Sequence, residues 1–241
     1  VLDVKVGRGA FMSDETAGRK LAQTMVDIGR DAGRQVIAII SDMNQPLGEA
    51  VGNALEVAES LETLHGAGPA DLREHCLAIA GYMLQLAGRG AKWTDETAVR
   101  RELEQKLSDG SAFEKFRQMI AAQGGDVGMV DDPSLLPQAS IRETFNAAQS
   151  GYIAQIAADE IAWAAFELGA GREKKDDPID LAVGLQVHVK VGDAVEQGTP
   201  LVTIYADDAA KVAACRARLD AAFAYSETPV EPLPLFYGVL R

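Results

Sequence analysis

The sequence predicts an α/β domain, in which helices flank a parallel or mixed sheet, followed by a smaller α+β domain. Three observations support this fold class. A short strand pattern, Leu2–Val6, and a β-branched apolar run, Val36–Ile40, enclose an amphipathic stretch of helical period. The middle of the chain is then largely helical. Beyond about Pro137, short strands and turns become frequent. We therefore expect two domains, residues 1–138 and residues 139–241.

The first two strands and the helix between them form a predicted βαβ unit. Ser13 is the expected N-cap of the helix, and Asp14 and Glu15 favour the positive end of its dipole. Gly33 is suited to end the helix. Strands joined by such a crossover run in the same direction, so we expect the two strands to be parallel.

A polar turn, Ser41–Pro46, follows the second strand, at the position where α/β sheets commonly build binding sites. Pro46 is suited to the first position of a helix. In that helix Asn53, Glu56 and Glu59 recur every three residues, so their side chains share one strip of its surface. The spacing alone is more typical of a solvated helix face than of a site.

The segment 71–123 is predicted to hold several helices. Thr94 is the expected cap of one, and Ser111–Glu114 reads as a capping box that opens another. The large apolar side chains of that helix are more typical of a core than of a cofactor site, and they are Phe113, Phe116 and Met119.

The histidines and cysteines give no sign of a metal site. His65 and His75 have no cysteine, histidine or carboxylate at metal-ligand spacing, so we interpret both as structural or solvated. Cys76 and Cys215 lie far apart, each in a predicted helix. We expect both to be buried free thiols, as is usual in a reducing cytoplasm.

Composition excludes several classes of protein. The chain has 36 acidic and 23 basic residues and a formal net charge of −13. A nucleic-acid binder needs clustered cations, and no such stripe occurs. No apolar run is long enough for a membrane span, and no secretory signal is visible. The first residues already read as a strand without an initiator Met, so we expect a further segment to precede them.

The segment 179–206 alternates apolar and polar residues around Gly-Asp and Gly-Thr-Pro turns. It looks like the half-barrel, or barrel-sandwich, of biotinyl and lipoyl carrier domains. Those carriers present one modifiable lysine at a hairpin tip, next to Met or between Asp and Ala, and no such tripeptide occurs here. Lys174 and Lys175 lie instead in a charged loop. We therefore expect the half-barrel fold without the carrier function.

Five ordered motifs resemble the pyrimidine-nucleoside and thymidine phosphorylases. They are Asp3-Val4-Lys5-Val6-Gly7-Arg8-Gly9-Ala10-Phe11-Met12; Ser41-Asp42-Met43-Asn44-Gln45-Pro46-Leu47-Gly48 with Gly52-Asn53-Ala54-Leu55-Glu56-Val57; Ala121-Ala122-Gln123-Gly124-Gly125-Asp126; Leu168-Gly169-Ala170-Gly171-Arg172; and Val191-Gly192-Asp193. The resemblance covers nearly the whole chain. It is strongest to the bacterial enzymes that accept both uridine and thymidine.

The resemblance implies a reversible reaction in which phosphate, the co-substrate, attacks the anomeric carbon of a pyrimidine nucleoside and releases the base and a pentose 1-phosphate. In the family, the phosphate loop and the residues that hold the pyrimidine lie before the Asp3-Val4-Lys5 strand, and the helices of the homodimer contact lie with them. The resemblance therefore implies that this chain is the carboxyl-terminal part of such an enzyme and is inactive alone.

Two groups of site residues carry over from the family. Phe11 and Met12 match positions that contact the 5-substituent of the pyrimidine. Leu47 and Ala50 match positions whose main-chain carbonyls bind a monovalent cation, potassium, and Glu59 matches its carboxylate ligand. All three supply hard oxygen ligands, which suit an alkali cation. The resemblance also implies a cytoplasmic enzyme whose partners are the nucleoside and phosphate, with no nucleic acid or membrane.

Two alternatives remain. A glycosyltransferase of related architecture, such as a phosphoribosyltransferase acting on anthranilate, fits the half-barrel tail and the Asn-Gln-Pro-Leu-Gly turn less well. A carrier or binding module built on the half-barrel is the rival from another class. An intact mass that shows a lipoyl or biotinyl adduct on Lys174, Lys175 or Lys190 would favour the carrier, and an unmodified mass would exclude it.

Overall fold

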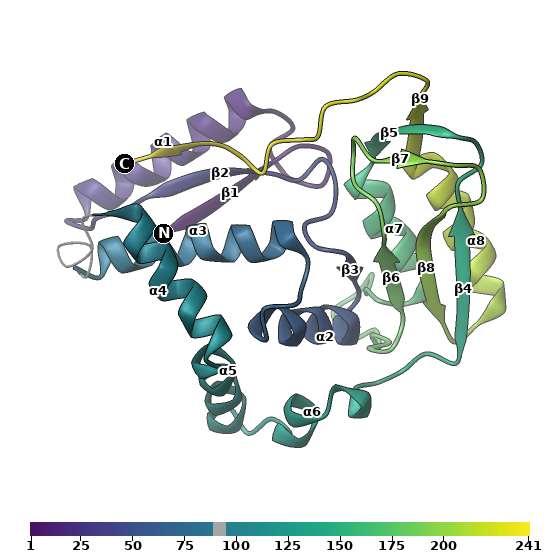
Figure 1. The fold of residues 1–241 in the computed structure, drawn as a ribbon, viewed down its shortest axis with the longest axis horizontal. Coiled ribbons are helices and arrows are strands. Elements are labelled where there is room, and N and C mark those ends of the chain that lie inside the picture. Colours follow the sequence, from purple (N-terminus) through teal and green to yellow (C-terminus); the bar gives the residue numbers. More distant parts are fainter. Residues whose placement is uncertain (89–94) are drawn as a thin grey trace. The chain divides into compact units, whose positions relative to one another are not determined.

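The computed structural model describes residues 1–88 and 95–241, and its chain divides into two compact units, each built from separate segments (Figure 1). Unit 1 comprises Val1–Asp42, Ser60–Asp132 and Pro234–Arg241. Unit 2 comprises Met43–Glu59 and Pro133–Leu233. The units therefore do not follow a single cut along the sequence. The expected domain boundary between residues 138 and 139 stays a prediction.

Unit 1 contains a mixed three-stranded sheet in the order β1-β2-β10. The strands β1 (Leu2–Val6) and β2 (Ala38–Asp42) pair in parallel, as the βαβ pattern predicts. Strand β10 (Phe236–Leu240) pairs antiparallel with β2. The sequence pattern did not reveal this third strand, which brings the carboxyl-terminal residues to the same sheet. The second strand begins and ends two residues later than the predicted Val36–Ile40.

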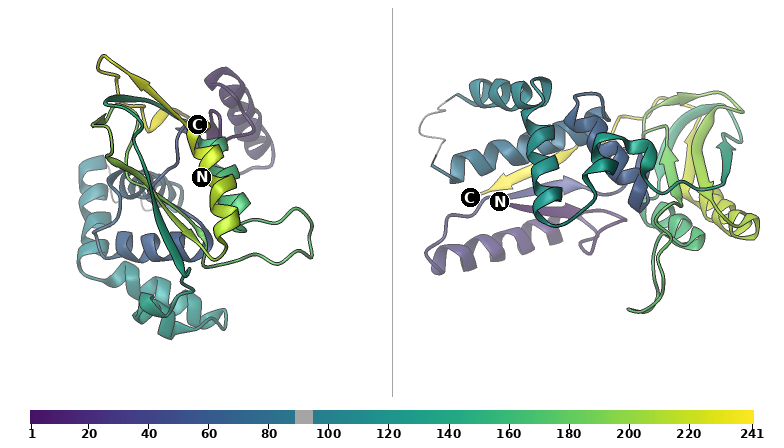
Figure 2. Two further views of the ribbon diagram at one scale, coloured as in Figure 1. Left: turned by 90° about the vertical axis from the view of Figure 1, so that its right-hand side faces the viewer. Right: turned by 90° about the horizontal axis from the view of Figure 1, so that it is seen from below.

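Helices cover both faces of this sheet (Figure 2). On one face, α1 (Glu15–Asp31) buries Ala22 and Val26 in a cluster with the valines of β1. The cap of α1 differs from expectation, because the Asp14 carboxylate, and not Ser13, accepts the Ala17 N–H at 2.9 Å. The other face carries the polar side chain of Asp3 beside the buried Ile39, and His75 of α3 contacts Asp3 there.

The remaining described helices of unit 1 follow one another along the chain: α3 (Ala70–Leu86), α4 (Glu96–Ser108), α5 (Ser111–Ala122) and α6 (Val127–Asp131). The prediction of a capping box at Ser111–Glu114 is wrong, because the N-cap of α5 is Gly110, which has no side chain to form a cap. The expected core residues of α5 are also wrong, since none of its residues is buried. Thr94 lies outside the described residues, and Cys76 is exposed where we expected a buried thiol.

Unit 2 contains two antiparallel sheets. The first has the order β3-β6-β8-β4, and the second the order β7-β5-β9. Their strands are β3 (Ala50–Val51), β4 (Ile141–Asn146), β5 (Gly151–Ile156), β6 (Gly184–Val187), β7 (Ala194–Val195), β8 (Pro200–Ala206) and β9 (Phe223–Ser226). A short 3₁₀ turn precedes them at Pro133–Leu135. The expected α+β composition agrees with these elements, and the half-barrel stays a prediction.

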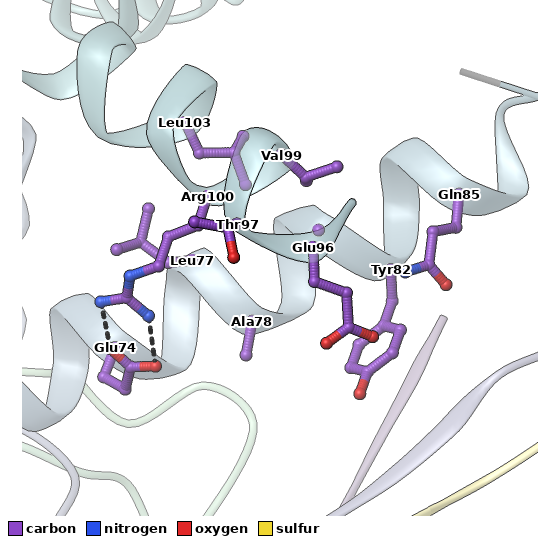
Figure 3. Close-up of a pocket in the computed structure, with 11 residues that line it drawn as sticks. Glu74, Leu77, Ala78, Tyr82, Gln85, Glu96, Thr97, Val99, Arg100 and Leu103 are labelled. Carbon is purple, nitrogen blue, oxygen red and sulfur yellow. Dashed lines mark hydrogen bonds and ion pairs between the residues drawn. The ribbon is translucent and has the colours of Figure 1, made fainter. Parts of the chain in front are cut away.

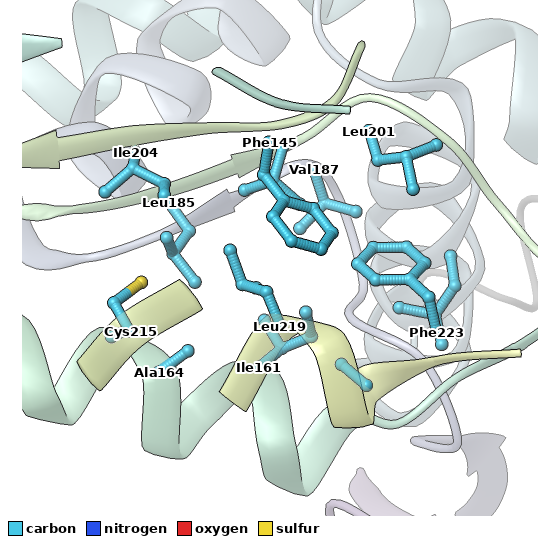
Figure 4. Packing of buried hydrophobic residues seen from close by; sticks show 14 of the residues in the cluster. Phe145, Ile161, Ala164, Leu185, Val187, Leu201, Ile204, Cys215, Leu219 and Phe223 are labelled. Atoms are coloured by element: carbon cyan, nitrogen blue, oxygen red, sulfur yellow. The ribbon is translucent and has the colours of Figure 1, made fainter. Parts of the chain in front are cut away.

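The core of unit 2 forms where α7 (Ala158–Leu168) and α8 (Ala209–Ala222) pack against the strands (Figure 4). Side chains from β6 and β8 face side chains from both helices, and the rings of Phe145 and Phe223 stack at 6.0 Å between centroids. Cys215 is completely buried in this core, as expected. Burial raises the pKa of its thiol to about 12.

The helix expected to start at Pro46 begins later, at Asn53, as α2 (Asn53–Leu64). The seven residues before it adopt other conformations, because Ala50 and Val51 form strand β3 and pair with β6. Gly48 and Gly52 have positive φ angles of 69° and 149°, which a right-handed helix excludes. The residues 43–52 therefore form a loop and a short strand, which lie in unit 2.

Within the ranges 1–88 and 95–241, no helix has the length and apolarity that a bilayer crossing requires. The same described residues contain no group of three or more His, Cys, Asp or Glu side chains that could hold a metal ion.

Candidate functional site

The loop 43–50 is held by contacts from distant parts of unit 2. The Asn44 carbonyl accepts the N–H of Ala158 at 3.0 Å. The Gln45 side-chain oxygen accepts the N–H of Val191 at 2.9 Å. These bonds join the loop to the first turn of α7 and to the turn after β6. The polar residues that suggested a site in the sequence therefore also anchor the loop.

Glu59 projects from α2 and binds the main chain of the same loop. Its Oε1 atom accepts the N–H of Glu49 at 2.7 Å and the N–H of Ala50 at 2.8 Å. The side chain is 9% exposed, and burial raises the pKa of the carboxyl group above its ordinary value. The two N–H bonds and the nearby Lys190 charge act in the opposite direction. Glu59 is therefore a buried acceptor and not a solvated helix residue.

Gly48 lets the carboxylate approach the loop. A Cβ atom at this position would lie 2.3 Å from Glu59 Oε2, and the φ angle of 69° is itself unfavourable for other residues. The Gly-Glu-Ala sequence of the loop and the Glu59 side chain thus form one closely packed arrangement. Of these residues, Glu59 and Ala50 were expected site residues, whereas Gly48 was not.

Lys190 completes the arrangement, and sequence reasoning missed this role. Its Nζ atom donates to the carbonyl oxygens of Pro46 at 2.8 Å and Gly48 at 2.6 Å. From the sequence, Lys190 is a candidate only for a carrier adduct. A separation of more than 140 residues hides the contact from any local pattern. The ammonium group lies against main-chain carbonyls, which differs from the exposed tip that a carrier lysine occupies.

The three candidate cation ligands lie on this loop and on α2. Ala50 contacts Glu59 directly, and Leu47 precedes the glycine that the carboxylate packs against. The Val187 N–H donates to the Glu49 carbonyl, so the peptide groups of Ala50 face away from β6 in the alternating antiparallel pattern. Two carbonyls and one carboxylate are hard ligands that suit an alkali cation. The ligand roles of Leu47, Ala50 and Glu59 stay predictions.

The candidate pyrimidine contacts lie in unit 1, directly after β1. Gly7 donates its N–H to the Met12 carbonyl at 2.9 Å and closes a tight turn. Met12 packs against the core cluster beside α1, whereas the Phe11 ring is fully exposed. Phe11 is thus available to a ligand or to another segment, and Met12 is partly occupied by the core. Their contact with a pyrimidine stays a prediction.

A second polar cluster lies on the α3 side of the unit 1 sheet. The Asp3 carboxylate accepts His75 Nε2 at 2.9 Å, contacts Lys5 Nζ at 2.9 Å and accepts the Ser41 hydroxyl. Burial alone would raise the pKa of Asp3, but the three hydrogen bonds and the Lys5 charge hold it far below its ordinary value. His75 is 6% exposed and stacks on the Phe236 ring. The interpretation of His75 as structural agrees with these contacts.

A groove of about 310 Å³ lies between α3 and α4 of unit 1 (Figure 3). Arg100 forms a bidentate ion pair with Glu74 on one side of it, at 2.7 and 2.6 Å. Leu77, Val99 and Tyr82 contribute apolar lining. No residue expected to bind substrate or cation lines this groove.

Two family models match the chain in sequence order. "Glycosyl transferase family, a/b domain" matches residues 1–113, and "Pyrimidine nucleoside phosphorylase C-terminal domain" matches residues 152–226. The first match contains the loop 43–50 and Glu59, and the second contains Lys190. The site arrangement therefore combines residues from both matched regions.

Curated relatives are similar over most of this chain. The pyrimidine-nucleoside phosphorylase of Geobacillus stearothermophilus is 48% identical over 237 residues, which are 98% of this chain and 54% of the relative. That of Bacillus subtilis (strain 168) is 52% identical over 207 residues, 86% of this chain and 47% of the relative. The chain spans about half the length of the curated relatives it matches. By these matches the chain belongs to the pyrimidine-nucleoside phosphorylase family.

Proposed function

We propose that this chain contributes to an enzyme that transfers a pentosyl group from a pyrimidine nucleoside to phosphate. The observation that carries the proposal is the 48% identity to a pyrimidine-nucleoside phosphorylase over 98% of the chain. The arrangement of the loop 43–50, Glu59 and Lys190 supports it, because this region lies within the similar sequence and is built around buried charge. Uridine and thymidine are the substrates we would test.

In the reaction, a phosphate oxygen forms a bond to the anomeric carbon while the bond from that carbon to the pyrimidine nitrogen breaks. The base leaves with the bonding electron pair and takes up a proton. Positive charge develops on the sugar and negative charge on the base, so catalysis requires positioned groups of both signs. We assign to Phe11 and Met12 an apolar contact with the 5-substituent of the pyrimidine.

Leu47, Ala50 and Glu59 are the residues we assign to a monovalent cation, potassium. When bound, this ion would supply a fixed positive charge beside the loop. The chain's own part would be to supply the carbonyl oxygens of Leu47 and Ala50 and the carboxylate of Glu59 as ligands. Glu59 already orders the Glu49 and Ala50 peptide groups, which supports this assignment.

We further propose that the enzyme is cytoplasmic and homodimeric. The family resemblance supports both statements, and sedimentation analysis of the complete enzyme tests the second. A carrier function is not favoured, because Lys190 is engaged with two carbonyls. An unmodified intact mass is the result we expect.

The direct test is phosphate-dependent release of uracil and thymine from their nucleosides. We would assay this chain alone and the same chain joined to the part of the Geobacillus stearothermophilus relative that it does not span. We expect release from the joined protein only, with higher activity in potassium than in choline chloride. A folded joined protein that releases no base from either nucleoside would refute the proposed function.

A further inference from the structure

Four residues of the five-residue segment 46–50 are bound by two opposite charges. The carbonyls of Pro46 and Gly48 accept from the Lys190 ammonium, and the N–H groups of Glu49 and Ala50 donate to the Glu59 carboxylate. The positive ammonium thus binds carbonyl oxygens, and the negative carboxylate binds N–H groups. Hydrogen bonds to charged groups are stronger than those between neutral groups. Lys190 and Glu59 therefore hold the peptide groups of the segment 46–50, in addition to the bonds that Asn44 and Gln45 make at the start of the loop.

The base of the Lys190 side chain is itself fixed. The Lys190 N–H donates to Asp193 Oδ2 at 2.7 Å, and the Val191 N–H donates to the Gln45 side chain at 2.9 Å. Gly192 takes a positive φ of 100° in the same turn. Because this turn is tied both to itself and to the loop, the lysine side chain extends from a defined position towards the carbonyls.

We propose that Lys190 is a positioning residue whose ammonium group is the resident cation of the loop 43–50. Two carbonyl oxygens around an ammonium are the ligands that an alkali cation would otherwise use. The inference rests on the proposed function in one respect, since the inorganic cation assigned to Leu47, Ala50 and Glu59 would bind a loop that Lys190 has already set. The carboxyl-terminal matched region thereby shapes a site assigned to the amino-terminal one.

Amide hydrogen exchange measures this role without requiring enzyme activity. The variant Lys190→Ala removes three methylene groups and the ammonium, and propylammonium replaces the same atoms. We expect exchange at the Glu49 and Ala50 amides to become about tenfold to a hundredfold faster in this variant. Added propylammonium should restore slow exchange, whereas neutral 1-propanol should not. A choline chloride buffer keeps alkali cations out.

Lys211 provides a matched control. Its Nζ atom also donates to a main-chain carbonyl, that of Leu168 at 3.3 Å, within the same unit. Lys211→Ala should leave exchange at Glu49 and Ala50 unchanged. If Lys190→Ala does not fold, Lys190→Met keeps the aliphatic chain and removes only the charge, and faster exchange at the same two amides is again expected.

Three results would overturn the inference. They are unchanged exchange in a folded Lys190 variant, equal acceleration in Lys211→Ala, and equal restoration by 1-propanol, which would show that only packing was lost. The proposed cation ligands are judged separately, by slower exchange of the same amides in wild-type protein when potassium replaces choline. Lys190 can therefore fail this test while the cation assignment survives, and the reverse also holds.

Discussion

The acceptor role of Glu59 predicts that two substitutions at this position differ sharply in stability. Glu59→Ala removes the oxygen that accepts the Glu49 and Ala50 N–H groups and leaves both donors, on half-buried residues, without this acceptor. Glu59→Gln keeps a carbonyl oxygen of the same reach. The comparison separates the need for an acceptor from the need for a negative charge.

The magnitudes follow from these contacts. Hydrogen bonds to a charged acceptor contribute about 1.5–3 kcal/mol each, and water entering the space left by the side chain would recover part of this. We therefore expect Glu59→Ala to lower the free energy of unfolding of unit 2 by about 2–4 kcal/mol. Glu59→Gln should change it by about 1 kcal/mol or less, because a neutral amide avoids the desolvation of a buried charge.

The assay is urea unfolding followed by Trp163 fluorescence in a Trp93→Phe background, since the chain has two tryptophans and Trp163 lies in unit 2. With a slope of about 1–3 kcal/mol per molar urea, Glu59→Ala should lower the midpoint by about 1–2 M. Equal losses in the Ala and Gln variants would refute the acceptor argument, and so would a neutral Ala variant.

The same carboxyl group predicts a pH dependence. Its pKa is raised in the folded state, so the protonated form is favoured by folding. The stabilisation from this group is fully present below the unfolded value of about 4.3 and is lost as pH rises through the folded value. Glu59→Gln cannot titrate. Its free energy of unfolding should therefore decline less than that of the wild type as the pH rises above the unfolded value of about 4.3.

Three further predictions concern other parts of the molecule. Asp3→Asn should destabilise unit 1 by about 1–3 kcal/mol at pH 7, measured by urea unfolding, because it weakens three hydrogen bonds including that of His75. Since the pKa of Asp3 is lowered, this wild-type stabilisation is present above about pH 4 and is lost in acid, so the two proteins should converge at low pH. Gly52→Ala should destabilise unit 2 by more than about 1 kcal/mol, because its Cβ would lie 2.5 Å from the main-chain oxygen of Val183, the residue before β6, and unchanged urea unfolding would contradict this. A thiol reagent should modify Cys76 in the native protein and leave Cys215 unmodified, and rapid loss of both thiols would show that the core of unit 2 opens readily.

The elements defined by local pattern were predictable. The strand before α1 has a short strand pattern, the strand after it has a β-branched run, and the helix has an apolar stripe of the right period. The βαβ unit and its parallel pairing therefore followed from the sequence. The errors lie at element ends. Ser13 and Asp14 are both suitable N-cap residues, so the sequence does not decide between them, and in the structure Asp14 caps α1. Gly110 is the N-cap of α5, which has no side-chain cap.

The start of α2 shows why the rest required the structure. Pro46 carries a valid helix-start signal, yet Ala50 and Val51 pair with β6, which lies more than 130 residues away in the sequence. Tertiary pairing overrides a local propensity in such a case. The same distance concealed the Lys190 contact. A resemblance to known enzymes indicated Leu47, Ala50 and Glu59, but no spacing rule joins any of them to this lysine.

The position of the loop 43–50 in the sequence and its contacts in the structure assign it to different parts of the chain. By sequence it follows β2 and lies within the region matched by the glycosyl transferase model, whereas by contact it belongs to unit 2. Its peptide groups are held by a carboxylate nearby in sequence and by an ammonium from far along the chain. A substitution near residue 190 should consequently alter the candidate cation site without touching any of its ligands. The region 152–226 therefore contributes to the candidate site, because its Lys190 holds the loop that carries two of the proposed ligands.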